Sequence, residues 1–376
     1  MEVVVSGLEL AYGDFVAVRD LDLTIPDGES VVLLGQSGCG KTSTMRCIAG
    51  LESPTAGTIT IGDRTVFDGR TGKVVPIHKR NVGMVFQSYA VWPHRTVLEN
   101  VAFPLKMKGI GKAERRKGAL EVLEVVGLAH LADRGASLLS GGQMQRVALA
   151  RSMAMAPSVL LLDEPLSNLD ARLRDDLRVE LRRIQTQRGL TSLYVTHDQQ
   201  EALALADRIA IMQGGRISQL GTPEQIYRRP RSASIAGFLG VTNVFPVAPD
   251  ATSRDLRLAD TGTTVRSLDE VPDGPSSVCI RPESVTVTPV TERPTALDGT
   301  DDNTVLLRAT VEVAVFQGSS IRCKVSTDDG LDMEAICPPP LHGTLTPGTP
   351  VELRIPVDAV LILPNEIEQP NEAVAA

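Results

Sequence analysis

Short, mostly apolar runs alternate with helix-like patterns along the first two thirds of the chain. The apolar runs cover residues 31–34, 159–162 and 193–196, and each has the length of a buried strand. Between and around them, residues 41–48, 142–155 and 170–187 carry apolar positions at helical spacing. Strands that alternate with helices predict an α/β fold, in which helices cover both faces of a largely parallel sheet.

Two segments depart from this alternation. Residues 94–134 show a helical pattern with few strand signals, which predicts a helical subdomain at about 88–157. Beyond Val241, Pro, Gly, Thr and Asp separate short β-like runs, a pattern typical of a small all-β sandwich or barrel. These runs are residues 278–280, 285–287, 305–313, 321–325 and 351–355. We therefore expect two domains, residues 1–240 and 241–376.

The charge is distributed unevenly between the two domains. Residues 1–240 hold 29 Lys/Arg and 25 Asp/Glu, or +4, whereas residues 241–376 hold 9 and 21, or −12. The first domain mildly favours anionic ligands and the second repels them. Neither has the basic footprint of a nucleic-acid-binding protein, so we expect no nucleic-acid partner.

Composition limits the location of the protein. The longest apolar runs are strand-length, far from the ~20 residues that a membrane-spanning helix needs, and the N-terminus lacks the features of a signal peptide. We expect a cytoplasmic protein that reaches a membrane only through integral partner subunits. The five cysteines are odd in number and have no C-x-x-C spacing, which favours reduced, mostly buried thiols.

Residues 35–42, with the sequence GQSGCGKT, match the phosphate-binding pattern G-x-x-x-x-G-K-[ST]. The run follows an apolar strand and opens a helix, so backbone N–H groups and the helix dipole face a phosphate chain. We expect Lys41 to reach the β- and γ-phosphates of ATP and Thr42 to ligate Mg²⁺. The alternative is a glycine-rich turn with a surface lysine, which the strand–turn–helix context disfavours.

Polar residues stand at the ends of three further predicted strands. Asp163 and Glu164 follow residues 159–162, and we expect Asp163 to hold Mg²⁺ and Glu164 to polarise the attacking water. Gln87 follows residues 82–86 and is able to touch both metal and water. His197 follows residues 193–196, within reach of a γ-phosphate. The alternatives are a solvated acidic pair, a polar strand end and a packed or surface histidine.

Residues 139–143, with the sequence LSGGQ, precede a helix. The Ser140 hydroxyl and the N–H groups of Gly141, Gly142 and Gln143 would form a second anion site there. One nucleotide rarely needs two γ-phosphate sites, but a head-to-tail pair of chains would use both. The alternative is a simple helix cap at Ser140.

The ordered set of residues 35–42, Gln87, 139–143, 163–164, 167–170 and His197 resembles the nucleotide-binding domain of ABC ATPases. This resemblance covers about residues 1–240 and implies a P-loop NTPase fold with ATP and Mg²⁺ as cofactors. It implies that Tyr12 stacks on adenine, that Asp170 crosses a homodimer interface and that Gln87 couples hydrolysis to membrane subunits. Nucleotide-binding residues implied in this way are Tyr12, Gly35, Ser37, Gly38, Cys39, Gly40, Lys41, Thr42, Ser43, Ser140, Gly141, Gly142, Gln143 and Asp170. The resemblance also implies that Thr42, Gln87 and Asp163 contact the metal. It implies that Glu164, His197 and Gln87 are the catalytic residues.

Residues 279–285, with the sequence CIRPESV, are similar to the Arg-Pro-Glu segment of the C-terminal oligomer-binding-like (TOBE) domain of importer ATPases. These importers are of the maltose, polyamine and ferric-iron type. The resemblance implies a homodimer that drives two integral permease subunits, supplied by a solute-binding protein, at the cytoplasmic face of the inner membrane. Residues 89–94 favour a polyamine, ferric iron or a related small solute over a sugar. A soluble ABC ATPase of DNA repair or translation and an exporter ATPase are the other classes, and the C-terminal domain disfavours both.

Two questions stay open from the sequence. Trp92 either anchors a partner as an exposed aromatic residue or packs inside the helical subdomain. The C-terminal domain either adds dimer contacts alone or binds a regulator. Arg95 and Met144 depart from the family pattern, and neither is expected to touch the nucleotide.

Overall fold

The computed structural model describes residues 1–248, 256–290, 303–341 and 343–366. The chain divides into two compact units, Met1–Ile226 and Tyr227–Ala376. The division falls inside the helix α7 (Pro223–Arg228), 14 residues before the boundary expected at 240/241. Each unit is described by itself below.

The first unit is built around a six-stranded sheet with the order β11-β10-β3-β9-β8-β7. Neighbours from β10 to β7 pair in parallel, and only β11 is antiparallel to its neighbour. The strands are β3 (Ser30–Leu34), β7 (Val82–Val85), β8 (Val159–Asp163), β9 (Ser192–Thr196), β10 (Arg208–Gln213) and β11 (Arg216–Gly221). Every residue of β3, β8 and β9 is buried, which confirms the three central strands predicted from the apolar runs.

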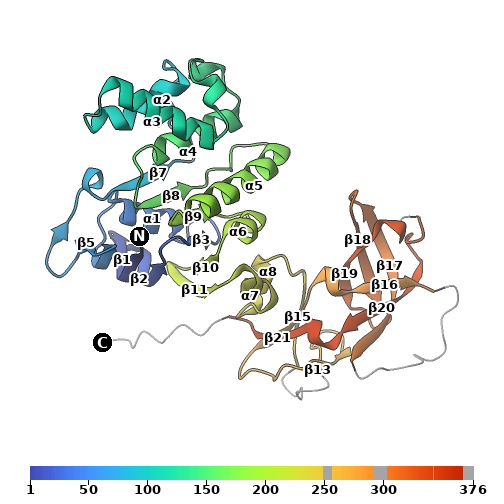
Figure 1. The fold of residues 1–376 in the computed structure, drawn as a ribbon. Helices are drawn as coiled ribbons and strands as arrows, with labels where there is room; N and C mark the ends of the chain where they lie inside the picture. Colours follow the sequence, from blue (N-terminus) through green and yellow to red (C-terminus); the bar gives the residue numbers. More distant parts are fainter. Residues whose placement is uncertain (249–255, 291–302, 342, 367–376) are drawn as a thin grey trace. The chain divides into compact units, whose positions relative to one another are not determined.

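A second, five-stranded antiparallel sheet lies on one side of the first, with the order β2-β1-β4-β5-β6. Its strands are β1 (Val3–Tyr12), β2 (Phe15–Ile25), β4 (Ala56–Ile61), β5 (Arg64–Asp68) and β6 (Lys73–Val74). The helix α1 (Lys41–Ala49) lies between the two sheets, because Met45 and Ile48 share one core with Val5 of β1 and Leu161 of β8. The helices α5 (Ala171–Arg188) and α6 (Gln199–Leu205) lie on the opposite side of the six-stranded sheet (Figure 1).

Three helices form the predicted helical insertion. They are α2 (Val97–Met107), α3 (Lys112–Val125) and α4 (Gly141–Met153), and each contacts the other two. Thr96 begins α2 with a reciprocal capping box to Glu99, and Ser140 begins α4 in the same way with Gln143. Figure 1 shows this group at the end of the unit that β7 reaches, so the segment after Gln87 leads directly into it.

The second unit begins with the last residues of α7 and with α8 (Ala233–Phe238). The rest of its described regular structure is β, apart from three short 3₁₀ helices at Pro282–Ser284, Pro339–Leu341 and Val357–Ala359. One sheet has the order β12-β15-β21, a second pairs β13 with β14, and a third has the order β16-β20-β17-β18-β19. The strands are β12 (Asn243–Pro246), β13 (Leu256–Arg257), β14 (Thr264–Val265), β15 (Ser276–Ile280), β16 (Thr286–Pro289), β17 (Thr304–Phe316), β18 (Ile321–Thr327), β19 (Asp332–Cys337), β20 (Pro350–Pro356) and β21 (Val360–Pro364). All five predicted runs fall on or against strands, and alternate residues of β18 and β20 are buried in one core.

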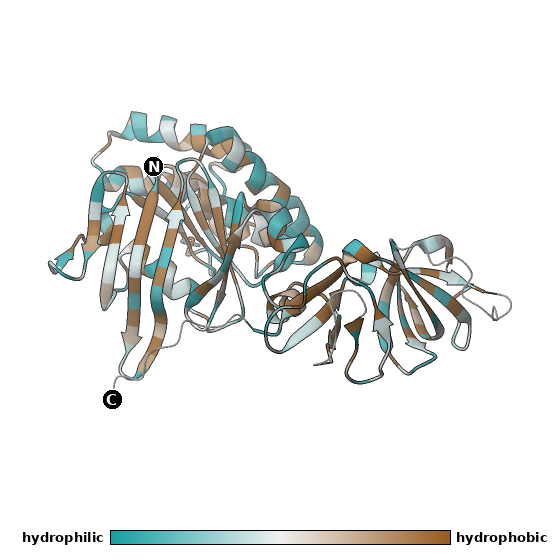
Figure 2. Ribbon diagram, turned by 90° about the horizontal axis from the view of Figure 1, so that it is seen from below, coloured by the Kyte–Doolittle hydropathy of each residue, from teal (hydrophilic) through white to brown (hydrophobic). Residues whose placement is uncertain are grey.

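Hydropathy follows this architecture. In Figure 2 the strands of both units carry long hydrophobic stretches, whereas the surface helices of the first unit carry many hydrophilic residues. No helix among the described residues is long and apolar enough to cross a bilayer. All five cysteines are free thiols, and their predicted burial is confirmed. Burial raises the pKa of Cys47 to about 12.

Candidate functional site: strand ends around the phosphate loop

Four adjacent parallel strands, β3, β9, β8 and β7, end at one edge of the six-stranded sheet. The phosphate loop follows β3, His197 follows β9, Glu164 follows β8, and Gln87 stands two residues beyond β7. Residues that are 33 to 162 positions apart in the sequence are therefore brought to one edge. This is the edge at which parallel α/β sheets bind their ligands.

Close packing requires the glycines of the phosphate loop. Gly40, the N-cap of α1, has φ +101°, and a Cβ there would lie 2.5 Å from the carbonyl oxygen of Ala17. A Cβ on Gly35 would lie 2.4 Å from the carbonyl oxygen of Met212 in β10. Gly38 also has a left-handed backbone, with φ +83°, but open space where a Cβ would be. The loop is thus held by backbone contacts from two neighbouring strands.

The Lys41 side chain lies inside this loop and is 5% exposed. Its Nζ donates to the carbonyl oxygens of Gly35 and Gln36, both at 2.8 Å. Ser37 and Gly38 are exposed at the rim, whereas Cys39 is buried beneath them. A buried ammonium within a ring of backbone groups is the arrangement expected of a phosphate-binding lysine.

Thr42 and Asp163 form a pair of hard oxygen donors beside the loop. The Thr42 Oγ1 donates to the Asp163 Oδ1 at 3.0 Å. Asp163 is 7% exposed, and burial raises the pKa of its carboxyl, more than the hydrogen bond from Thr42 lowers it. A hydroxyl and a carboxylate in contact suit Mg²⁺, which prefers such ligands and would offset the cost of burying the charge.

Glu164 lies between the other two catalytic candidates. Its Oε1 is 3.1 Å from the His197 Nδ1, and its Oε2 accepts from the Gln87 Nε2 at 3.3 Å. The backbone of Glu164 has φ +41°, a left-handed conformation that costs a non-glycine residue about 1–2 kcal/mol. Its N–H donates to the Val195 carbonyl at 3.0 Å, which ties the end of β8 to β9. The structure therefore brings Glu164, His197 and Gln87 together, with backbone strain at the central residue.

Two neighbours of Glu164 make contacts that no sequence pattern predicted. The Ser167 Oγ donates to the Glu164 carbonyl at 2.9 Å and accepts from the Gln87 Nε2 at 3.3 Å. The Asn168 Nδ2 donates to the Gln87 carbonyl at 2.9 Å. The sequence signals were their position in the loop after Glu164 and their place in the family motif at residues 167–170, neither of which indicates these partners. Together they fix the side chain and backbone of Gln87 against that loop.

The second predicted anion site lies at the start of α4. The Ser140 Oγ accepts from the Gln143 N–H at 3.4 Å, and the Gln143 Oε1 accepts from the Ser140 N–H at 3.0 Å, which is the simple helix cap considered above. A Cβ on Gly142 would lie 2.8 Å from the Leu173 side chain, so the turn packs closely on α5. Asp170 caps α5 by accepting from the Leu173 N–H at 3.0 Å.

Tyr12, the predicted adenine contact, ends β1 and is 51% exposed. Its hydroxyl is hydrogen-bonded to the Glu52 carboxylate, which raises the pKa of the phenol. Among the described residues, no hydrogen bond joins Tyr12, Ser140 or Gln143 to Thr42, Asp163 or Glu164.

Trp92 packs within the helical insertion, which is the second of the two positions considered for it. The indole is half-buried and packs edge-on against Phe103 of α2, with ring centroids 4.5 Å apart. The guanidinium groups of Arg95 and Arg151 also lie over the indole ring, 5.4 and 4.9 Å from its centroid. The unusual Arg95 thus packs against an aromatic pair within the helical insertion.

Two family models match the chain, "ABC transporter" at residues 18–167 and "TOBE domain" at residues 278–363. The chain is 48% identical over 280 residues to the Fe(3+) ions import ATP-binding protein FbpC of Rhizobium etli, covering 74% of this chain and 77% of the relative. It is 46% identical over 321 residues to the spermidine/putrescine import ATP-binding protein PotA of Thermobifida fusca, covering 84% and 80%. The chain belongs to the ATP-binding subunits of ABC transporters.

Solved structures agree with this assignment. CbiO1 from Clostridium perfringens, part of an ABC transporter complex, is similar with a TM-score of 0.55 and 29% identity, over 60% of this chain and 90% of that one. The ATP-binding cassette MJ0796, as a post-hydrolysis dimer with ADP and Pi, has a TM-score of 0.51 and 32% identity, over 59% and 98%. The predicted fold class, a P-loop NTPase domain followed by a TOBE-type β domain, is therefore confirmed, and the chain is an ABC-type ATPase that binds ATP.

Proposed function

We propose that this subunit powers solute import: two copies bind two ATP molecules head to tail, and the cycle of closure and reopening drives two integral permease subunits. The proposal places the protein on the cytoplasmic face of the inner membrane, supplied indirectly by a solute-binding protein. It rests on relatives whose names state an import function and on the domain order, with the ABC transporter match at residues 18–167 followed by the TOBE match at residues 278–363.

The central observation is the Glu164 carboxylate between His197 and Gln87, beside the Thr42–Asp163 pair. In the proposed reaction, Glu164 orients and polarises the water that attacks the γ-phosphate, and His197 contacts that phosphate. Lys41 binds the β- and γ-phosphates, and Tyr12 stacks on the adenine. Thr42, Asp163 and Gln87 would hold Mg²⁺, which neutralises charge on the transferred phosphoryl group.

The second copy would complete each site. Ser140 and the N–H groups of Gly141, Gly142 and Gln143 would face the γ-phosphate bound by the partner subunit, and Asp170 would lie at the interface. The capping box is compatible with this role because the Ser140 Oγ accepts within the box and still has a hydrogen to donate.

The solute is a separate question from the ATPase chemistry. Relatives named for ferric iron, polyamines and trehalose/maltose are 48%, 46% and 51% identical to the chain, so identity does not select among their solutes. The proposal therefore covers the coupling of ATP hydrolysis to solute transport. It assigns the choice of solute to the permeases and the binding protein.

The test is Glu164→Gln, which keeps the shape and the contact with Gln87 but removes the charge. We expect ATP binding to remain and turnover to fall by about 10²–10⁴-fold, with a dimer that persists in ATP. Glu180→Gln, on the surface of α5, is the matched control and should turn over ATP normally. Wild-type turnover by Glu164→Gln would refute the catalytic role. Purification of the tagged chain from gently solubilised membranes without polytopic proteins would refute the import role alone.

A further inference from the structure

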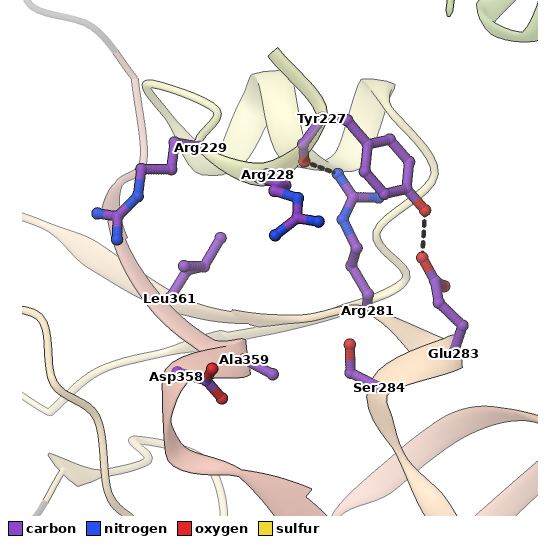
Figure 3. Close-up of a pocket in the computed structure, with 9 residues that line it drawn as sticks. All are labelled: Tyr227, Arg228, Arg229, Arg281, Glu283, Ser284, Asp358, Ala359 and Leu361. Carbon is purple, nitrogen blue, oxygen red and sulfur yellow. Dashed lines mark hydrogen bonds between the residues drawn. The ribbon is translucent and has the colours of Figure 1, made fainter. Parts of the chain in front are cut away.

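A pocket of about 460 Å³ lies within the second unit, where three separate segments meet (Figure 3). The segments are the end of α7, the Arg-Pro-Glu turn after β15, and the turn before β21 with its first residues. The pocket is lined by Tyr227, Arg228, Arg229, Arg281, Glu283, Ser284, Asp358, Ala359 and Leu361. None of these residues belongs to the ATP site.

One wall of the pocket is fixed by its own contacts. The Arg281 guanidinium lies over the Tyr227 ring, 3.5 Å from its centroid, and donates to the Tyr227 carbonyl. The Tyr227 hydroxyl is hydrogen-bonded to the Glu283 carboxylate, and Figure 3 shows these three side chains side by side. Because each of the three holds the next, this wall is organised before any ligand binds.

The charge of the pocket is opposite to that of the unit around it. Residues 227–376 contain 12 Lys/Arg and 21 Asp/Glu, or −9, but the pocket is lined by three arginines against two carboxylates. Figure 3 shows the Arg228 side chain directed from α7 toward the pocket interior. A cationic pocket on an acidic domain concentrates anions locally.

The remaining lining sets the size and character of the ligand. Leu361 and Ala359 supply apolar surface, and the Ser284 hydroxyl supplies a neutral donor. A volume of about 460 Å³ is within the range of small-molecule sites and exceeds what a bare oxyanion fills. Guanidinium groups bind carboxylate and phosphate oxygens in pairs.

We propose that this pocket binds a small organic anion, with its carboxylate or phosphate oxygens at Arg228, Arg229 and Arg281 and its carbon skeleton on Leu361 and Ala359. The site is independent of the ATP site and gives the C-terminal domain a ligand-binding role in addition to any dimer contact.

The experiment is calorimetric titration of the full-length chain with citrate, 3-phosphoglycerate and inorganic phosphate. The chain is saturated with ADP so that the phosphate loop does not take the probe. We expect at least one organic anion to bind with a Kd of about 1 mM or tighter, and inorganic phosphate to bind more weakly. Arg228→Gln/Arg229→Gln should weaken that binding by about tenfold or more, since it removes two charged donors.

Arg322→Gln/Arg354→Gln is the control variant. It removes the same charge from the same unit, at side chains that are 45% and 57% exposed, and should leave binding unchanged. Absence of binding by both organic anions at ten times that concentration would overturn the proposal. An equal loss of affinity in the two double variants would also overturn the proposal. Binding of inorganic phosphate as tightly as the organic anions would do the same. Unchanged unfolding temperatures verify that both variants are folded.

Discussion

Arg151 connects the helix that carries the Ser140 turn with the segment that follows Gln87. From α4 it donates through Nη1 to the Ala90 carbonyl at 2.6 Å and through Nη2 to the Tyr89 carbonyl at 3.1 Å. Those two residues have φ +49° and +58°, consecutive left-handed conformations outside glycine. We predict that Arg151 stabilises this strained segment and that Arg151→Met releases it.

The expected magnitude follows from these contacts. Two hydrogen bonds from a charged donor contribute about 3 kcal/mol at the lower end of their range, and the contact with Trp92 adds about 0.5–1 kcal/mol. Relaxation of the two left-handed residues in the variant offsets about 2 kcal/mol of this loss in stability. The free energy of unfolding should therefore fall by about 1–2 kcal/mol, a modest loss that leaves the protein folded.

The larger effect should be on turnover. The Gln87 carbonyl accepts from Asn168 and its side chain contacts Glu164, so a relaxed segment two residues further on would displace both interactions. We expect a lower kcat with little change in the KM for ATP, because the phosphate loop is held by other strands. Trp92 is the only tryptophan of the chain, so its fluorescence should report the loss of the stacked guanidinium directly.

Arg151→Lys is the matched control. Lysine keeps the charge but lacks the planar fork that reaches both carbonyls, so its kcat and fluorescence should lie between those of the wild type and Arg151→Met. A wild-type kcat in Arg151→Met, or a loss carried wholly by KM, would show that the segment is held by something other than Arg151.

Two further predictions concern the phosphate loop and its metal ligand. Asp163→Asn should abolish ATP hydrolysis yet raise the unfolding temperature of the nucleotide-free chain at pH 7. Burial raises the pKa of Asp163 above its ordinary 3.8, so the ionised carboxyl costs stability as the pH rises through its folded pKa. The gain in unfolding temperature from Asp163→Asn should therefore vanish below pH 3.8. An equal gain at pH 7 and below pH 3.8 would contradict this reasoning. Gly40→Ala should destabilise the chain far more than Gly38→Ala in chemical denaturation. Both need a left-handed backbone, which costs about 1–2 kcal/mol for alanine, but only Gly40 has a carbonyl oxygen 2.5 Å from its Cβ position.

Features set by neighbouring residues could be predicted from the sequence. The phosphate loop, the start of α5 at Asp170 and the end of α1 at Gly50 all depend on local backbone chemistry, and the structure has each of them. The β structure of the second unit could also be predicted, because the alternate burial of strand residues gives the apolar positions a period of two in the sequence.

Contacts between distant residues could not be predicted in the same way. The bonds of Ser167 and Asn168 to Gln87 join positions 80 and 81 residues apart, and they exist only because β7 and β8 are neighbours. An apolar run marks a strand as buried but does not say which strand lies beside it. The left-handed backbone of Glu164 and the bridge from Arg151 are likewise products of tertiary packing.

The same strand order explains why the catalytic candidates form one group. Of the strands in the six-stranded sheet, β3, β9, β8 and β7 are consecutive neighbours, although their order in the sequence is β3, β7, β8, β9. If β7 lay beside β3 instead, Gln87 would meet the phosphate loop and lose Glu164, and the carboxylate would stand beside His197 alone. The bond from the Glu164 N–H to the Val195 carbonyl holds the ends of β8 and β9 together at the point where this geometry matters. The arrangement of the water-polarising group therefore depends on the sheet topology as much as on the residues that the motifs name.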